Sequence, residues 1–144
     1  MSGPWEQTWD AVNDAFGRVA GELSASNPAL WWVCGHTDNE VFPFRAYAAF
    51  NSAGVAGEED IVVSLDFQRS PGTLAFRSDI SRGSGEIVAD GPSGELSLAT
   101  DVATVRAWIE QCTTEFIAFL IASRSLLMLE LTDGVDLGES LHEP

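Results

Sequence analysis

Lysine is absent from this chain, and its seven basic residues are all arginines. They face 22 Asp and Glu residues spread over the whole length, so the formal net charge is −15 at pH 7. Such a chain repels nucleic acid phosphates and anionic membranes, because affinity for either depends on clustered Lys and Arg. We therefore expect no nucleic acid and no membrane partner, and we expect a cationic protein to be attracted, most strongly at low salt. Alternatively, the arginine-only usage and the acidic surface reflect the composition of the host genome and a need for solubility.

Cysteine is almost as scarce. Cys34 and Cys112 are too few for a disulfide framework and too far apart in the sequence for paired metal ligands, which favours a reducing cytoplasm. Residues 1–10 lack the basic and apolar regions of a signal peptide. The most apolar run, Phe116–Ala122, is far shorter than the ~20 residues that span a bilayer. The sequence predicts a cytoplasmic protein without a transmembrane helix, and no motif in it predicts a cofactor.

A long segment without Gly or Pro runs from Asp101 to Leu131. Apolar or small residues recur in it at steps of three and four, which predicts one amphipathic helix over 101–131. Its first half should expose the polar residues Arg106, Glu110, Gln111, Thr113, Thr114 and Glu115. Its second half is apolar on more than one side, so it either packs between a sheet and another helix or dimerises.

We favour a homodimer, because one flank of this helix would otherwise face water in a two-layer monomer. The candidate interface residues are Phe116, Phe119, Leu120 and Leu127. A last strand over Leu126–Leu131 is the less favoured alternative to helix, since Leu, Met and Glu prefer helix. Residues 132–144 are expected to form an acidic, mobile tail, which leaves 1–131 as a single domain of ordinary size.

A first amphipathic helix is predicted over Ser2–Leu23, with Pro4 in its first turn. Its apolar face is formed by Trp5, Trp9, Val12, Phe16, Val19 and Leu23. Aromatic residues at helical spacing are more often part of a core than anchors for a partner. We therefore interpret Trp5 and Trp9 as core residues.

Between the two helices the apolar period changes to two, and turn residues divide the segment. The predicted strands cover Leu30–His36, Val41–Ser52, Ile61–Gln68, Thr73–Arg82, Gly85–Asp90 and Glu95–Thr100. A type II turn at Ser70–Thr73 sets Phe67 opposite Phe76, Val63 opposite Ile80 and Asp66 opposite Arg77. A register shifted by two would lose the charge pair. These elements predict an α+β fold, a two-layer sandwich in which an antiparallel meander of about five strands is covered on one face by an N-terminal and a long C-terminal helix.

One row of residues could ligate a metal. Cys34, His36, Asp38 and Glu40 share one face of an extended chain. Zinc needs four donors that converge, whereas neighbours on a straight strand diverge. We therefore favour a buried Cys34 and a turn at Asp38, and predict no metal site. Nucleophilic catalysis by either cysteine is disfavoured too, because His36 and His142 are the only histidines that could act as its base.

The alternative to a protein-binding module is a small-molecule pocket, or a small enzyme, between the sheet and the long helix. Its candidate residues are Trp31, Trp32, Phe44, Arg45 and Tyr47. Arg45 or His36 would supply the polar group. Because Trp31 and Trp32 are adjacent on a strand, only one of them can face such a pocket.

In size, acidity, α+β layout and possible dimerisation, the chain resembles the secretion chaperone-like proteins, small acidic dimers that hold a partner polypeptide. It departs from them at Ser70–Thr73, where that fold usually has a helix between its third and fourth strands. The chain is similar, to the same degree, to small acidic bacterial immunity proteins. The resemblance implies a chaperone, immunity factor or inhibitor. With the charge, it favours a non-enzymatic module that binds a cationic or partly unfolded protein.

Overall fold

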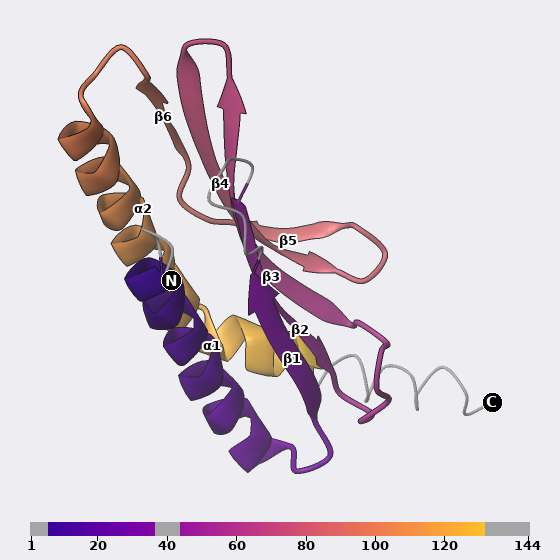
Figure 1. The fold of residues 1–144 in the computed structure, drawn as a ribbon. Helices are drawn as coiled ribbons and strands as arrows, with labels where there is room; N and C mark the ends of the chain where they lie inside the picture. Colours follow the sequence, from indigo (N-terminus) through magenta and orange to yellow (C-terminus); the bar gives the residue numbers. More distant parts are fainter. Residues whose placement is uncertain (1–5, 37–43, 132–144) are drawn as a thin grey trace.

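The computed structural model describes residues 6–36 and 44–131. The elements follow in the order α1 (Glu6–Ser26), β1 (Trp31–His36), β2 (Phe44–Asn51), β3 (Ile61–Ser70), β4 (Thr73–Arg82), β5 (Ile87–Asp90), β6 (Gly94–Ser97) and α2 (Val102–Ala122). A further helix, Arg124–Leu131, follows α2. Figure 1 shows α1 and α2 on the same side of the sheet. The predicted α+β fold, with an antiparallel meander between an N-terminal and a C-terminal helix, is confirmed.

The β3–β4 hairpin forms in the predicted register. Ser70 pairs with Thr73, Asp66 with Arg77 and Phe67 with Phe76. Gly72 has φ +77°, a left-handed conformation that a type II turn requires at its third position. Turn chemistry and the alternation of apolar residues were therefore enough to fix this pairing.

The last two strands do not extend the meander one after the other. The strand order is β1-β2-β3-β4-β5, and β6 also pairs with β4. β5 lies along Asp79–Ser81 and β6 along Thr73–Phe76, so both occupy the same edge of β4. The chain between them is held where the Gly91 N–H donates to Ser78 O (3.0 Å) and the Ser78 hydroxyl donates to Pro92 O (2.7 Å).

The core lies between the sheet and the helices. The strand residues that point towards the helices are buried, and they alternate with more exposed residues on the other face. The largest fully buried side chains are Phe16, Phe44, Phe50, Phe67, Phe76, Phe116, Leu65, Leu74, Ile80, Ile109, Leu120 and Leu127. In α1, the predicted face is confirmed for Trp9, Val12, Phe16, Val19 and Leu23, all of which are buried. Trp5 lies outside the described residues.

Helix α2 packs on the sheet and against α1. The rings of Phe16 and Phe116 meet edge to face with their centres 5.8 Å apart. Thr113, predicted to be exposed, is buried at 5% exposure because α1 covers this flank, and its hydroxyl donates to Ile109 O at 2.8 Å. The flank of α2 that suggested a homodimer is thus covered, at least in part, by α1 of the same chain.

The predicted single helix over 101–131 is wrong at Ser123. There the chain bends by 50° between α2 and the Arg124–Leu131 helix. The Ser123 hydroxyl donates to Phe119 O at 2.7 Å, a local bond that competes with the regular helical pattern. Leu126–Leu131 is helical, as favoured over a strand. In the described part of the chain no single helix is long and apolar enough to span a membrane, and α2 and the Arg124–Leu131 helix meet that criterion only as a bent pair.

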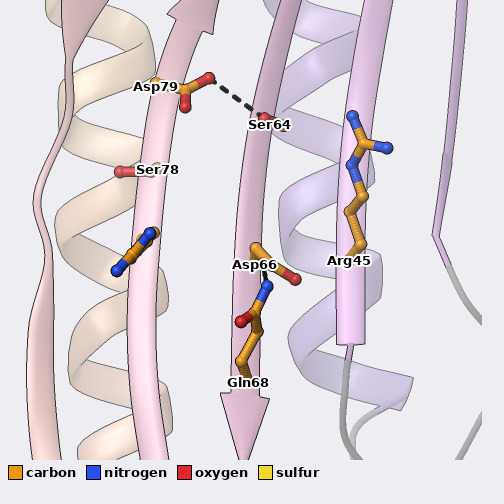
Figure 2. Close-up of a pocket in the computed structure, with 7 residues that line it drawn as sticks. Arg45, Ser64, Asp66, Gln68, Ser78 and Asp79 are labelled. Atoms are coloured by element: carbon orange, nitrogen blue, oxygen red, sulfur yellow. Dashed lines mark hydrogen bonds between the residues drawn. The ribbon is translucent and has the colours of Figure 1, made fainter.

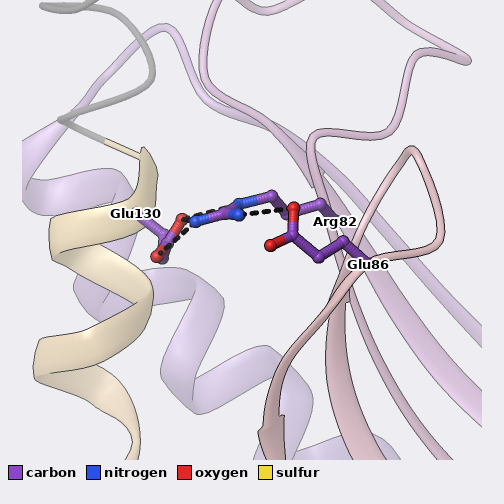
Figure 3. Close-up of polar contacts among 3 residues, drawn as sticks. All are labelled: Arg82, Glu86 and Glu130. Atoms are coloured by element: carbon purple, nitrogen blue, oxygen red, sulfur yellow. Dashed lines mark hydrogen bonds and ion pairs between the residues drawn. The ribbon is translucent and has the colours of Figure 1, made fainter.

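Two ion pairs anchor the Arg124–Leu131 helix. The Arg82 guanidinium, at the end of β4, donates to both carboxylate oxygens of Glu130 at 3.2 Å and also pairs with Glu86 at 2.7 Å (Figure 3). At the start of the helix, Arg124 pairs with Glu22 of α1 at 2.8 Å. The helix is therefore tied both to the sheet and to α1.

Candidate functional site: the outer face of the sheet

The sheet has one face turned away from the helices, which we call the outer face. Its residues alternate with the helix-facing ones along β1 to β4, and α1 and α2 lie on the other side of the sheet (Figure 1). The outer face comprises Trp31, Val33, Gly35, Arg45, Tyr47, Ala49, Asn51, Val62, Ser64, Asp66, Gln68, Ala75, Arg77, Asp79 and Ser81. Ala49, Asn51 and Val62 are buried, and the other residues of this face are exposed or half-buried.

Strand pairing arranges the outer face in rows that cross the sheet. One row is apolar and joins Val33, Ala49 and Val62. Val33 is 39% exposed, whereas Ala49 and Val62 are buried. Beside it Gly35 lies opposite Tyr47, and the Tyr47 ring packs so closely on Gly35 that a Cβ there would be 3.3 Å from it. The apolar side chains that keep exposed surface here are Val33 and, in part, Trp31 and Tyr47, and aromatic residues are enriched at protein interfaces.

The next row is charged and alternates in sign. Arg45 lies opposite Asp66, and Asp66 lies opposite Arg77. The Gln68 amide donates to the Asp66 carboxylate at 2.6 Å. Arg45 Cζ lies 5.7 Å from the centre of the Tyr47 ring, a cation–π distance. These contacts hold the side chains of Asp66 and Arg45 in place on the face.

The polar rows border a hollow of about 590 Å³. It is lined by Arg45, Ser64, Asp66, Gln68, Arg77, Ser78 and Asp79. Figure 2 shows the Ser64 hydroxyl directed to Asp79 across the two strands, a hydrogen bond of 3.3 Å. With two arginines and two aspartates, the lining has no net formal charge, so the hollow suits a group that carries both signs or none.

The residues predicted to line one pocket lie on both sides of the sheet. Trp32 and Phe44 face the helices, and Phe44 packs on Trp9 with ring centres 5.3 Å apart. Trp31, Arg45 and Tyr47 lie on the outer face. Because alternate strand residues point to opposite faces, these five side chains do not converge on a space between the sheet and the long helix.

The residues predicted to form an interface lie mainly in the core. Phe116, Leu120 and Leu127 are each 0% exposed within the single chain. Phe119 is partly buried, and a Cβ on Gly91 would lie 2.8 Å from its ring. A charged substitution at any of the three fully buried positions would therefore disturb the fold itself, whatever its effect on an interface.

The predicted row of metal ligands is only partly described. Asp38 and Glu40 lie outside the described residues, and within 6–36 and 44–131 no group of three or more His, Cys, Asp or Glu side chains is placed to hold a metal. The His36 ring stacks on Trp9 with centres 6.0 Å apart, and its Nδ1 lies 3.1 Å from the Asn13 amide nitrogen. His36 is thus engaged in packing between β1 and α1.

Both thiols are disfavoured as nucleophiles. Partial burial raises the pKa of Cys34, and burial together with the charge of Glu115 raises the pKa of Cys112 to about 12. A thiolate is the reactive form of cysteine, so these environments hold both side chains in the unreactive form at neutral pH.

Sequence reasoning missed most of the residues that line the hollow. Ser64, Gln68 and Asp79 were not singled out, although they alternate with the buried residues of the β3–β4 hairpin. The signal was present in the predicted register, which already set Asp66 opposite Arg77 on a polar face. What the sequence did not show was which face of the sheet the helices cover.

The chain matches no protein-family model, no curated protein and no solved structure. The fold and the outer face therefore carry the functional argument by themselves. They define an acidic two-layer α+β protein whose sheet has a largely polar, partly exposed face on the side away from α1 and α2 (Figure 1).

Proposed function

We propose that this protein is a non-enzymatic binding module that holds a protein partner on the outer face of its sheet. The observation that carries the proposal is the outer face itself. Apart from the buried Asn51, the polar and charged side chains of this face are exposed or half-buried and lie beside Val33, which is 39% exposed, on the side of the sheet turned away from α1 and α2 (Figure 1). Val33 and the half-buried Trp31 and Tyr47 keep apolar surface that a partner would remove from water, and the polar rows add specificity.

The charge of the molecule supports a cationic or partly unfolded partner, as a chaperone, immunity factor or inhibitor would bind. A net charge of −15 attracts positive proteins and raises their rate of encounter. On the outer face, Asp79 lies directly opposite Asp90 of β5, which places two carboxylates side by side. A Lys or Arg of the partner that bound between them would relieve their repulsion.

The proposal is tested by affinity capture from the native host with two variants of equal charge. Asp79→Asn with Asp90→Asn removes two carboxylates from the sheet, whereas Asp10→Asn with Asp14→Asn removes two exposed carboxylates from α1. We expect the sheet variant to lose a cationic protein that the wild type and the α1 variant both retain at low salt. Equal loss in both variants, or no captured protein at all, would contradict the proposal.

A small-molecule function is the second candidate, and the hollow of about 590 Å³ favours it. This hollow lies on the outer face, lined by polar side chains, and not between the sheet and α2. A ligand there would have to satisfy Arg77 together with Asp66 and Asp79. Arg77→Ala would then abolish ligand binding, while capture of a protein partner through the Asp79–Asp90 pair would continue.

A further inference from the structure

The strand β1 is one edge of the sheet, and its backbone is open to further pairing. In an antiparallel edge strand, alternate residues point their N–H and C=O groups away from the sheet. In the described part of the chain, Trp31–Gly35 make no backbone hydrogen bond beyond the β1–β2 ladder. α1 packs over the helix-facing side of β1, where a Cβ on Gly17 would lie 3.9 Å from the Trp32 ring.

The opposite edge of the sheet is protected in several ways. It consists of two strands of four residues each, β5 and β6, with Pro92 between them. The pairing of β4 with β5 shifts register between Ile80 and Ser81, as a β-bulge does. Short strands, bulges, proline and charged residues are the devices by which edge strands avoid pairing with other chains.

The edge at β1 has none of these devices. It is six residues long, has no proline and pairs with β2 in unbroken register. β1 also carries no Asp, Glu, Lys or Arg, whereas each of the other five strands carries at least one charged residue. In a chain of net charge −15, the open edge is thus the one strand on which two copies can meet without placing like charges opposite each other.

We propose that two copies of this chain pair through β1, antiparallel about a two-fold axis at Val33, to form one continuous sheet. A two-fold axis perpendicular to the sheet keeps each side chain on its own face. Residues that lie opposite each other across the axis must therefore point to the same face, which means that both are odd-numbered or both are even-numbered. Centred on Val33, the pairing sets Val33 against Val33 and Trp31 against Gly35 of the second copy. The largest side chain of the outer face then lies beside the residue with no side chain. On the helix side, Trp32 lies against Cys34.

This pairing extends the outer face without requiring the function proposed above. The apolar row Val33–Ala49–Val62 would continue across the axis into the same row of the second copy. Its salt dependence also differs from that of partner binding. Two molecules of charge −15 repel, so screening by salt strengthens the dimer, whereas salt weakens the binding of a cationic partner.

The oligomeric state of the purified full chain tests the pairing. We expect sedimentation equilibrium to show a dimer that tightens as sodium chloride is raised. Val33→Lys places two like charges opposite each other on the axis and should weaken the dimer at least tenfold. Ile87→Lys, the matched control on the opposite edge, should leave it intact. Val33 and Ile87 are 39% and 54% exposed, so both positions accept a lysine in the monomer. A monomer at all salt concentrations, or a dimer weakened only by Ile87→Lys, would overturn the proposal.

Disulfide formation tests the register of the β1–β1 pairing. This test does not depend on whether the Val33→Lys variant folds. Residues directly opposite in an antiparallel pair have Cα atoms about 4.5–5.5 Å apart, within the range that a disulfide spans. In a Cys34→Ser background, Val33→Cys should therefore cross-link two copies on mild oxidation. Trp31→Cys should not, because two copies of residue 31 would be about 13 Å apart along the strand. A Cys34–Cys34 disulfide in the wild type, or cross-linking by Trp31→Cys alone, would overturn the proposed axis.

Discussion

At the scale of single residues, Cys112 is a buried small side chain on the core-facing side of α2. It is 3% exposed, and its pKa is raised to about 12 by burial first and by the charge of Glu115 second. We expect the Cys34→Ser variant to react at pH 8 far more slowly with a thiol reagent than a free cysteine does. The rate should rise about tenfold per pH unit while the fold persists, because only the thiolate reacts. Fast labelling of the folded variant at pH 8 would show that Cys112 is accessible and ionised.

Phe116 shows how much of the stability lies in single aromatic contacts. It is 0% exposed and packs against Phe16 of α1 and Phe119 of its own helix. We expect Phe116→Ala to lower the free energy of unfolding by about 3 to 5 kcal/mol, the usual cost of removing a buried phenylalanine. Val102→Ala, at a position 77% exposed, should change it by less than about 0.5 kcal/mol. Urea unfolding of both variants measures the difference, and similar midpoints would place Phe116 outside the core.

At the scale of elements, α2 begins at a defined cap. The Asp101 carboxylate accepts a hydrogen bond from the Thr104 N–H at 2.7 Å, and this bond lowers the pKa of Asp101 below its usual value. A carboxyl whose folded pKa is lowered stabilises the fold above its unfolded pKa, and the stabilisation is lost as the pH falls through the folded pKa. Asp101→Ala should therefore lower the melting temperature at pH 7 and have less effect near pH 3. A pH-independent difference in circular dichroism melts would contradict this account of the cap.

The Arg124–Leu131 helix depends on its ties to distant elements. The Arg82 and Glu130 side chains are 42% and 21% exposed, so their pair is screened in part by solvent. We expect Glu130→Gln to speed amide hydrogen exchange over residues 124–131, by a factor that shrinks as salt is raised. Glu110→Gln on α2, which removes the same charge elsewhere, is the control. Equal exchange in both variants would show that the Arg82 pair does not hold this helix.

The same helix shows where sequence reasoning reaches its limit. Apolar spacing predicted α2 and the face of α1, because those patterns are local to each element. The bend at Ser123 has no proline or glycine to mark it. The bent helix is held by two ion pairs between residues far apart in the sequence, Glu22 with Arg124 and Arg82 with Glu130. No periodicity within residues 101–131 contains that information.

At the scale of the whole molecule, the layers could be predicted and the open face could not. The turn at Ser70–Thr73 and the alternation of apolar residues predicted the register of the β3–β4 hairpin. The apolar spacing of the two flanking segments predicted the helices that cover the sheet. Which strand residues lie on the outer face depended on which face of the sheet α1 and α2 cover together. With α1 beside α2, Phe116 and Leu120 of the second half of α2 are buried within the chain, and we propose the functional surface on the sheet instead of on the helix.

The proposed use of that surface is tested most directly by carboxylate labelling with the captured partner bound. Asp66, Asp79 and Asp90 lie on the sheet, whereas Asp10 and Asp14 lie exposed on α1. Carbodiimide labelling read by mass spectrometry reports the accessibility of each group. We predict that the partner lowers labelling of the three sheet aspartates severalfold and leaves the two α1 aspartates unchanged. Protection of Asp10 and Asp14 with full labelling of the sheet would contradict the assignment of the outer face.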